Sequence, residues 1–189
     1  MATSCPMKFN VDYLRDQVRN TYDQVAREPN RHYHFHRGPD YAHSFLGYDR
    51  NELAALPALS TERFAGVGNP LAIGPLEPGA TVLDHACGAV MDLLLAARRV
   101  GPDGHAIGID MTPAMVECTR NAAEQAELAD RVEVHQGFYE DLPIADASVD
   151  MLISNGVLNL APDKRHVLGE IFRVLKPGGR LYLADVVVQ

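Results

Sequence analysis

The sequence has no tryptophan and only three cysteines among its 189 residues. Cys5, Cys87 and Cys118 are odd in number and follow no metal-ligand spacing, which argues against a disulfide framework and for reduced thiols. No apolar run reaches the length of about 18 residues that a membrane span requires, and the N-terminus has no basic flank before an apolar core. We therefore expect a cytoplasmic protein that has no contact with a membrane.

Clusters of basic residues are also absent. Lys and Arg number 17 against 25 Asp and Glu, a formal net charge of −8, and no stretch concentrates positive charge as phosphate binding requires. We expect no nucleic-acid partner. The hydrophobic fraction of 47% is typical of a globular protein. The length suffices for one domain with a sizeable core, or for one domain and a small lobe.

Residues 81–97 have the pattern of a strand, a turn and a helix. A short apolar run ends in Asp84, small residues follow, and apolar positions then recur at helical spacing. In doubly wound sheets, such a turn brings backbone N–H groups and a helix N-terminus to a nucleotide-like ligand. Asp110 closes the next apolar run, where an acid can accept hydrogen bonds from both ribose hydroxyls. The two acids predict a nucleoside-bearing cofactor.

Strand and helix patterns alternate through the rest of the sequence. They predict strands at 81–84, 105–110, 132–136, 149–154 and 180–188, helices at 90–100, 113–128 and 162–175, and a turn at 176–179. Thr112 is expected to cap its helix, with Pro113 at the first helical position. This order predicts an α/β fold with a Rossmann-like, doubly wound and mostly parallel sheet.

Several segments together resemble the class I S-adenosylmethionine-dependent methyltransferases. The resemblance covers roughly residues 64 to 189 and rests on segments 82–92, 107–115, 141–143, 149–155 and 173–180. It implies S-adenosylmethionine as cofactor and methyl transfer to the oxygen, nitrogen or carbon of a small-molecule substrate. The residues that it places around the cofactor are Asp84, Ala86, Cys87, Gly88, Asp110, Met111, Phe138, Tyr139 and Asn155.

The expected cofactor turn departs from the family pattern. Glycine is preferred at three small positions, where this sequence has Ala86, Gly88 and Val90. Glycine permits unusual φ values and close backbone approach, which alanine tolerates only in part and valine poorly. Phe138 stands where the family often has an acid for adenine, so we expect ring stacking by Phe138 or Tyr139 instead.

Segments 66–70, 110–113 and 154–164 are similar to the arsenite methyltransferase branch of this family. Thiols stand in that branch where this sequence has Val67 and Gly156, and a cysteine-containing segment stands where it has histidines. Arsenic, a soft centre, prefers thiolate ligands, which valine and glycine cannot provide. We therefore expect an acceptor other than arsenite, with Asn69 and Gly156 beside it.

The first 70 residues are expected to form an N-terminal helical cap, and residues 71–189 the cofactor-binding domain. Apolar residues within 8–26 fall on one helical face. This pattern predicts a helix that covers the cofactor site and turns Tyr22 toward the pocket. An acidic capping box at Asp49 predicts a second, short helix.

Three histidines alternate with aromatic residues between positions 32 and 36. In an extended strand, His32, His34 and His36 would share one face, as in an open metal site, whereas Gly38 and Pro39 indicate a loop. We expect no bound metal, and we place His34 and His36 in the substrate pocket, where a general-base role stays open.

Two other functions remain open. Ala86, Val90 and the expected absence of the last strands of the usual seven-stranded sheet also fit a catalytically silent binding or scaffold subunit. The histidines alternatively fit a metal-binding protein. Residues 181–188 would form an apolar, unprotected sheet edge. Either the chain is a fragment truncated after the fifth strand, or a second polypeptide, such as another copy of the chain, completes the sheet.

Overall fold

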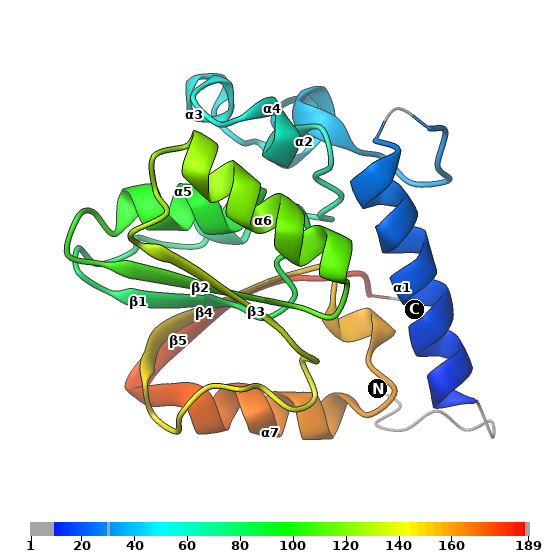
Figure 1. The fold of residues 1–189 in the computed structure, drawn as a ribbon. Coiled ribbons are helices and arrows are strands. Elements are labelled where there is room, and N and C mark those ends of the chain that lie inside the picture. The colour runs from blue at the N-terminus through cyan, green and yellow to red at the C-terminus, as the bar shows by residue number, and fades with distance from the viewer. Residues whose placement is uncertain (1–9, 30, 188–189) are drawn as a thin grey trace.

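The computed structural model of the chain describes residues 10–29 and 31–187 (Figure 1). Its centre is a five-stranded sheet in the order β3-β2-β1-β4-β5, with every neighbouring pair parallel. The strands are β1 (Thr81–Asp84), β2 (His105–Asp110), β3 (Val132–Gln136), β4 (Val149–Asn155) and β5 (Leu175–Ala184). The predicted α/β, Rossmann-like fold is confirmed, with fewer strands described than the usual seven.

Helices cover both faces of this sheet. Figure 1 shows α5 (Met91–Arg99) and α6 (Pro113–Gln125) on one face and α7 (Lys164–Val174) on the other. Strands β1 and β4 are therefore buried on both sides along most of their length, as is typical of parallel sheets. The connections place the reversal of strand order between β1 and β4.

The N-terminal part is helical, as predicted, and shares its core with the sheet. It contains α1 (Val11–Arg27), α2 (Gly38–Leu46), α3 (Arg50–Ala54), α4 (Ala58–Thr61) and the 3-10 turn η1 (Pro70–Ala72). Asp49 caps α3 by accepting hydrogen bonds from the N–H groups of Asn51 and Glu52. Leu56 and Phe64 belong to the same core cluster as residues of β1 and α5. The domain boundary at residue 70 stays a prediction.

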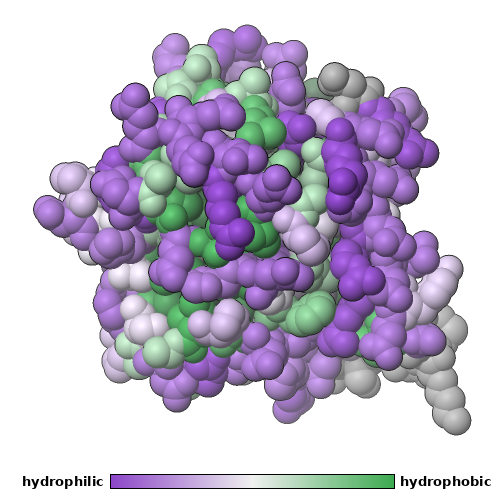
Figure 2. Space-filling view, in the orientation of Figure 1, coloured by the Kyte–Doolittle hydropathy of each residue, from purple (hydrophilic) through white to green (hydrophobic). Residues whose placement is uncertain are grey.

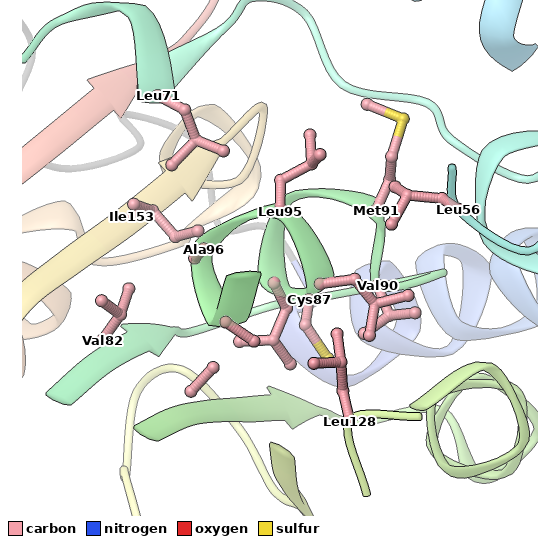
Figure 3. Packing of buried hydrophobic residues seen from close by; sticks show 14 of the residues in the cluster. Leu56, Leu71, Val82, Cys87, Val90, Met91, Leu95, Ala96, Leu128 and Ile153 are labelled. Carbon is pink, nitrogen blue, oxygen red and sulfur yellow. The ribbon is translucent and has the colours of Figure 1, made fainter. Parts of the chain in front are cut away.

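The main hydrophobic cluster lies between the sheet and α5. Figure 3 shows Val82 of β1, Leu95 and Ala96 of α5, Ile153 of β4 and Leu71 from the N-terminal part in this cluster. A second cluster on the other face joins Leu83, Leu152 and residues of α7. Neighbouring residues of one strand thus serve opposite faces, because side chains alternate along a strand.

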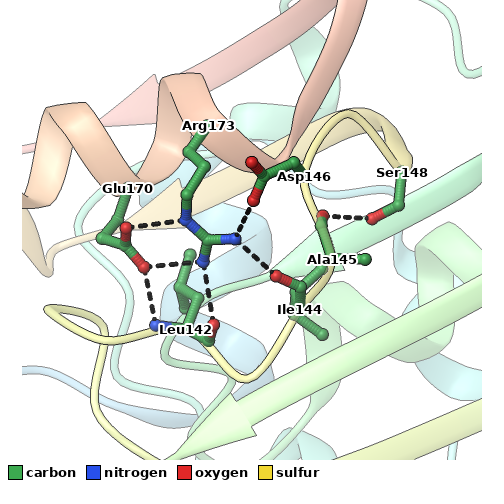
Figure 4. A network of polar contacts seen from close by, with 7 residues as sticks. All are labelled: Leu142, Ile144, Ala145, Asp146, Ser148, Glu170 and Arg173. Carbon is green, nitrogen blue, oxygen red and sulfur yellow. Dashed lines mark hydrogen bonds and ion pairs between the residues drawn. The ribbon is translucent and has the colours of Figure 1, made fainter.

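Arg173 of α7 fixes the loop that joins β3 to β4 (Figure 4). Its guanidinium donates to the carbonyl oxygens of Leu142 and Ile144 at 2.9 and 2.7 Å and pairs with Asp146 and Glu170. Glu170 in turn accepts the N–H of Leu142 at 3.0 Å. Tyr139 belongs to the same loop, so the network holds the segment that carries one wall of the site described below.

Several predicted boundaries are wrong in detail. Helix α7 begins after Asp163, whose side chain accepts the N–H of His166, rather than at residue 162. The predicted turn at 176–179 is part of β5, which pairs irregularly with β4 there and ends at Ala184. Thr112 does precede α6 at the N-cap position, with Pro113 first in the helix, but its side chain makes no capping hydrogen bond.

The face of the molecule in Figure 2 is mainly hydrophilic, with hydrophobic side chains showing between polar ones. Within residues 10–29 and 31–187, no helix is long and apolar enough to cross a membrane. In the described sheet, β3 and β5 form the two edges. Pairing of the β5 edge with another chain stays a prediction.

Candidate functional site

A cavity opens at the carboxyl ends of the central strands. Asp84 ends β1, Asp110 ends β2 and Asn155 ends β4, and all three line the cavity. It encloses about 870 Å³, part of it open to solvent. The other walls come from α1, residues 63–66, the turn after β1, the loop after β3 and residues 156–160. Ligands of open parallel sheets bind at this place, where the strand order reverses.

The turn between β1 and α5 brings its backbone to the cavity. Gly88 has a φ of 49°, and no atom lies within 4 Å of the position that a Cβ would take there. Its N–H donates to Asp110 Oδ2 at 3.0 Å, and the N–H of Cys87 donates to the carbonyl oxygen of Ile109 at 2.9 Å. The turn is thus tied to the end of β2. Gly88 leaves room for a ligand in contact with the backbone.

Cys87 packs its side chain into the core. A Cβ added to Gly108 would lie 2.8 Å from Cys87 Sγ, so the thiol sits between the turn and β2. Figure 3 shows Cys87 among the hydrophobic residues there. Burial raises the pKa of this thiol well above its ordinary value. The thiol is therefore a neutral packing group, and only the backbone of Cys87 is suited to a ligand contact.

Val90 takes a left-handed backbone conformation, with φ 74° and ψ 4°, immediately before α5. A β-branched residue reaches this region only at a cost of roughly 1–2 kcal/mol. Its side chain is 1% exposed and joins the core cluster that contains Met91 (Figure 3). The backbone thus has the conformation that favours glycine, and burial of the isopropyl group compensates for the strain.

Asp110 is held by backbone groups on both oxygens. Oδ1 accepts the N–H of Thr112 at 2.8 Å and Oδ2 accepts the N–H of Gly88 at 3.0 Å. Burial raises the pKa of Asp110, and these two N–H groups oppose the rise. Each carboxylate oxygen can accept a second hydrogen bond. Asp110 therefore keeps acceptor capacity for a ligand in the cavity, next to Met111, which also lines it.

Two further carboxylates and one histidine lie at the same cavity. Burial raises the pKa of Asp84 well above its ordinary value and that of Asp92 to about 6. Burial lowers the pKa of His85 to about 4, so its imidazole is uncharged at neutral pH. His85 pairs with Ser154 of β4 at 2.8 Å. The cavity consequently favours ligands with positive charge or hydrogen-bond donors at the carboxylates.

Asn155 holds the N-terminal part against the strand ends. Its Oδ1 accepts the N–H groups of Val67 and Gly68, and its Nδ2 donates to the carbonyl oxygen of Gly68 and to Asp92 Oδ2, both at 2.9 Å. Tyr48 donates to Asp92 Oδ1 at 2.6 Å. The amide of Asn155 is therefore fully engaged with the protein, and its predicted contact with the cofactor lacks a free polar group.

Helix α1 forms one wall of the cavity, and its role as a cover over a cofactor stays a prediction. Val18 and Tyr22 line the cavity, and burial together with the charge of Asp110 raises the pKa of Tyr22. Figure 1 shows α1 at one end of the sheet, beside α6. Arg15 fixes this helix to the loop after β3 through Glu140 at 3.0 Å. Tyr22 is thus placed at the pocket beside Asp110.

Four predicted site residues lie outside the cavity lining. Phe138 is 44% exposed because its ring turns outward, under the guanidinium of Arg15 at 5.5 Å, while Tyr139 does line the cavity. His36 stacks on Tyr41 at 5.2 Å, and His34 lies edge-on to Phe35 at 5.0 Å. Asn69 ends the loop before η1, with its Oδ1 buried among described residues that offer it no partner.

The segment around the histidines is irregular. Residues 31–37 form bends and loop rather than a strand, so the imidazoles of His32, His34 and His36 share no strand face. Among residues 10–29 and 31–187, no three His, Cys, Asp or Glu side chains come together as metal ligands would. The loop that Gly38 and Pro39 indicated is confirmed, with α2 beginning at Gly38.

Val67 and Gly156 face each other. A Cβ added to Gly156 would lie 3.2 Å from Val67 Cγ1. Gly156 has a φ of 74° and lines the cavity, whereas Val67 is 38% exposed and is not part of the cavity lining. Cys118 is partly buried, and burial raises the pKa of its thiol. Positions 67 and 156 therefore offer a hydrocarbon side chain and bare backbone, and no thiol.

Arg63 and Phe64 are among the cavity residues that escaped the sequence analysis. Arg63 lies after α4 in an irregular stretch, and Phe64 is buried beside Tyr48 at a ring distance of 5.4 Å. Neither belongs to a strand-turn-helix pattern, and no charge or spacing signal singles them out. They reach the cavity because the N-terminal part packs on the strand ends.

A family model described as "Methyltransferase domain" matches residues 76–189. An arsenite methyltransferase from Halobacterium salinarum is 47% identical over 142 residues, which cover 75% of this chain and 36% of the relative. A demethylmenaquinone methyltransferase from Listeria welshimeri is 36% identical over 110 residues, 58% of this chain and 46% of the relative. The chain thus spans less than half the length of these relatives.

The fold is also similar to solved structures. The crystal structure of an arsenic(III) S-adenosylmethionine methyltransferase from Chlamydomonas reinhardtii superposes with a TM-score of 0.62 at 38% sequence identity. The match covers 70% of this chain and 46% of that one. The strands β1, β2 and β4, at whose carboxyl ends the cavity lies, fall within residues 76–189 that the family model matches.

Proposed function

Since the chain belongs to the class I S-adenosylmethionine-dependent methyltransferases, we propose that it transfers the methyl group of S-adenosylmethionine to a small-molecule acceptor other than arsenite. The observation that carries the proposal is the junction of Gly88 and Asp110. Gly88 presents backbone with no atom within 4 Å of its absent Cβ, and its N–H holds the carboxylate of Asp110 at 3.0 Å.

The residues at this junction fit the cofactor. Asp110 keeps lone pairs for the ribose hydroxyls, and the free space at Gly88 allows the ligand to contact the backbone. Asp84 and Asp92 add buried carboxylates to the same cavity, which suits a ligand that carries a sulfonium and an ammonium. Met111 and Tyr139 supply the apolar and aromatic walls that a purine needs.

Methyl transfer asks little of side chains, because the sulfonium of the bound cofactor already activates the methyl group. The chain has to bind, align and shield the reactants. Val18 and Tyr22 of α1 cover the cavity and limit the entry of water. The turn after β1 and Asp110 hold the cofactor in one orientation, so the acceptor approaches from the side of Gly156 and Val157.

The acceptor end of the cavity supports a substrate that does not require thiolates. Phe64, Gly66, Gly156 and Val157 line it with hydrocarbon and backbone. Val67 and Gly156 have no sulfur, and the thiols of Cys87 and Cys118 both have raised pKa values. We propose a largely apolar acceptor that is methylated on oxygen, nitrogen or carbon.

Arsenite is the second candidate, since two of the similar proteins are named for arsenic methylation. A trivalent arsenic centre prefers thiolates, so this function requires thiols other than those at positions 67 and 156. Transfer of labelled methyl groups to arsenite, measured with and without an added small thiol, separates the two candidates. Methylation of arsenite under either condition would overturn the proposed acceptor class.

Calorimetric titration with S-adenosylmethionine and S-adenosylhomocysteine tests the cofactor. Micromolar binding is expected for the chain, and binding weaker by about tenfold or more for Asp110→Ala, which removes an acceptor of the ribose hydroxyls. An Asp130→Ala variant is the matched control, because Asp130 lies on a surface loop with its side chain 78% exposed. Equal affinity of Asp110→Ala and the unsubstituted chain would contradict the assignment.

A further inference from the structure

Asp92 lies at the end of the cavity that the proposed function gives to the acceptor. It lines the cavity together with Gly66 and Gly156. Its Oδ2 accepts a hydrogen bond from Asn155 Nδ2 at 2.9 Å, and the same Nδ2 donates to the carbonyl oxygen of Gly68 at 2.9 Å. A Cβ on Gly66 would overlap that Nδ2. These contacts place the carboxyl group of Asp92 beside residues 66–68 and the end of β4, where the acceptor approaches.

The three buried acids of the cavity differ in their readiness to accept a proton. Asp110 is held through both oxygens by backbone N–H groups, and the proposed function assigns it to the ribose. Burial and the charges of Asp92 and Asp110 raise the pKa of Asp84 well above its ordinary value, which favours the neutral form of Asp84. Burial raises the pKa of Asp92 to about 6, so Asp92 is mostly ionised at neutral pH. A general base is most effective when its pKa lies near the working pH.

The groups that face Asp92 tune its ionisation. Asn155 of β4 and Tyr48, which follows α2, donate hydrogen bonds to the carboxylate, and the charge of Arg99 of α5 also favours the ionised form. All three oppose the rise of the pKa of Asp92 that burial causes. The negative charge of Asp92 in turn raises the pKa of Asp84 at the end of β1. Asp84 therefore stays neutral while Asp92 is ionised.

Both protonation states of Asp92 have hydrogen-bond partners within the protein. In the ionised state, Tyr48 donates to Oδ1 at 2.6 Å. In the protonated state, Oδ1 can donate to the Tyr48 oxygen, and the Tyr48 hydroxyl then donates to the carbonyl oxygen of Gly68 at 3.1 Å. Asn155 donates to Oδ2 in either state. Asp92 can therefore take up and release a proton without leaving a buried polar group unpartnered.

We propose that Asp92 is the general base of the methyl transfer and that the acceptor group is a phenolic hydroxyl. This inference rests on the proposed function, which places S-adenosylmethionine in the cavity. A phenolic hydroxyl has a pKa of about 10, like that of tyrosine, whereas an aliphatic hydroxyl, like water, holds its proton far more tightly. An aromatic ring also fits the hydrocarbon of Phe64 and Val157 at this end of the cavity.

The proposed step balances in atoms and charge. A lone pair of the hydroxyl oxygen forms the new bond to the methyl carbon, the carbon–sulfur bond breaks, and its electron pair stays on sulfur. The hydroxyl proton passes to the carboxylate of Asp92. The positive charge of the sulfonium and the negative charge of Asp92 thus disappear together, which leaves a thioether, a methyl ether and a neutral carboxyl group. Since the pKa of Asp92 is about 6, the carboxyl group returns the proton to solvent at neutral pH.

Two acceptor probes that differ in their need for a base test the inference. Transfer of labelled methyl groups from S-adenosylmethionine is measured at about pH 8 with phenol, which is protonated there, and with 4-nitrophenol, which is already ionised. Asp92→Asn is expected to slow transfer to phenol by about 100- to 10,000-fold, the usual contribution of a general base. Transfer to 4-nitrophenol is expected to fall by less than about tenfold, because no proton has to be removed.

Asp150→Asn is the matched control. Asp150 also joins separate parts of the chain, since it accepts the N–H of Thr81 at 2.9 Å and pairs with Lys176 at 2.8 Å, and it lies outside the cavity lining. This variant is expected to keep the unsubstituted rate with both probes. If Asp92→Asn slows both probes by the same factor, Asp92 acts by holding Asn155 and Tyr48, and the inference is wrong.

The pH profile of the unsubstituted chain tests the same point without a variant. With phenol and saturating S-adenosylmethionine, the rate is expected to rise as Asp92 ionises and to be level above about pH 7. A rate that continues to rise with pH up to about 9 would show that phenolate formed in solution is the reacting species. That result would overturn the role of Asp92.

The failures can be told apart. Binding of S-adenosylmethionine without methylation of either probe overturns the inference and leaves the proposed function in place. Absence of S-adenosylmethionine binding to the folded chain overturns the proposed function, and the inference with it.

Discussion

Asn155 Nδ2 donates a hydrogen bond to Asp92 Oδ2 at 2.9 Å, and this contact joins the end of β4 to the start of α5. The same amide binds Val67 and Gly68 of the N-terminal part. A Cβ on Gly66 would overlap Asn155 Nδ2, so the chain approaches this amide as closely as glycine permits. One side chain therefore joins the cap, the sheet and the helix that borders the cavity.

Asn155→Ala is expected to lower the free energy of unfolding by about 2–4 kcal/mol, because it leaves the N–H groups of Val67 and Gly68 and the carboxylate of Asp92 without their partner. Urea denaturation followed by circular dichroism measures this. Asn159→Ala serves as control, since Asn159 is exposed and engages its backbone rather than its side chain. Equal stability of both variants would show that the cap is held by other contacts.

Ionisation of Asp92 lowers the free energy of unfolding as pH rises. Burial raises its pKa from 3.8 to about 6, so the folded chain binds more protons than the unfolded chain between these values. The contribution of this carboxyl group is therefore greatest below pH about 4 and is lost as pH rises through about 6. The loss amounts to about 3 kcal/mol for such a shift.

Asp92→Asn removes the ionisation and can keep the contacts, because an amide accepts from Asn155 and donates to Tyr48, whose hydroxyl then donates to the carbonyl oxygen of Gly68. We expect the stability of Asp92→Asn relative to the unsubstituted chain to increase between pH 4 and pH 7. Denaturant midpoints at both pH values measure it. A difference that does not change with pH would contradict the assignment of the pKa to Asp92.

The strand ends could be predicted from the sequence, and the contacts made by the N-terminal part could not. Asp84, Gly88 and Asp110 follow from local patterns, since a strand, a turn and a helix place them at one sheet edge. Asn155 reaches that edge too, but the tertiary contact with Gly66–Gly68 decides what its amide does. Its engagement depends on residues about 90 positions away, which no local pattern reports.

Side-chain direction decides the outcome for the other predicted site residues. Tyr22 was placed at the pocket from the helical face of α1, and the structure brings it there because α1 packs along α6. Phe138 and Tyr139 are neighbours in a loop, and only Tyr139 turns inward; a loop has no period from which this choice could be read. The stacking of His36 on Tyr41 likewise depends on where α2 begins.

Gly88→Ala tests whether the turn leaves its space for the cofactor. A Cβ meets no protein atom there, so the stability cost comes from the positive φ and is about 1 kcal/mol. The new methyl group nevertheless occupies the cavity side of the turn. We expect the affinity for S-adenosylhomocysteine to fall by much more than the stability does, as calorimetry and thermal unfolding measured on one sample would show.

Gly47→Ala is the matched control for this substitution. Gly47 also has a positive φ, 75°, with nothing within 4 Å of its absent Cβ, and it ends α2 outside the cavity lining. It should lose similar stability and keep the ligand affinity. Equal affinities of the two variants would mean that the cofactor does not approach Gly88.

Val90→Gly separates backbone strain from core packing at the start of α5. Glycine removes the strain of a left-handed valine, which is roughly 1–2 kcal/mol. It also removes an isopropyl group that is 1% exposed and whose burial contributes about 1.5–3 kcal/mol. Glycine further destabilises the folded state because it adds flexibility to the unfolded chain. The net expectation is a loss of about 1–2 kcal/mol.

Val90→Ala keeps part of the strain and loses the two methyl groups, so it should be at least as unstable as Val90→Gly. At an ordinary buried valine, by contrast, the alanine variant is more stable than the glycine variant. Urea denaturation of both variants measures the order, and a clearly more stable alanine variant would show that the φ of 74° at this position stores little strain.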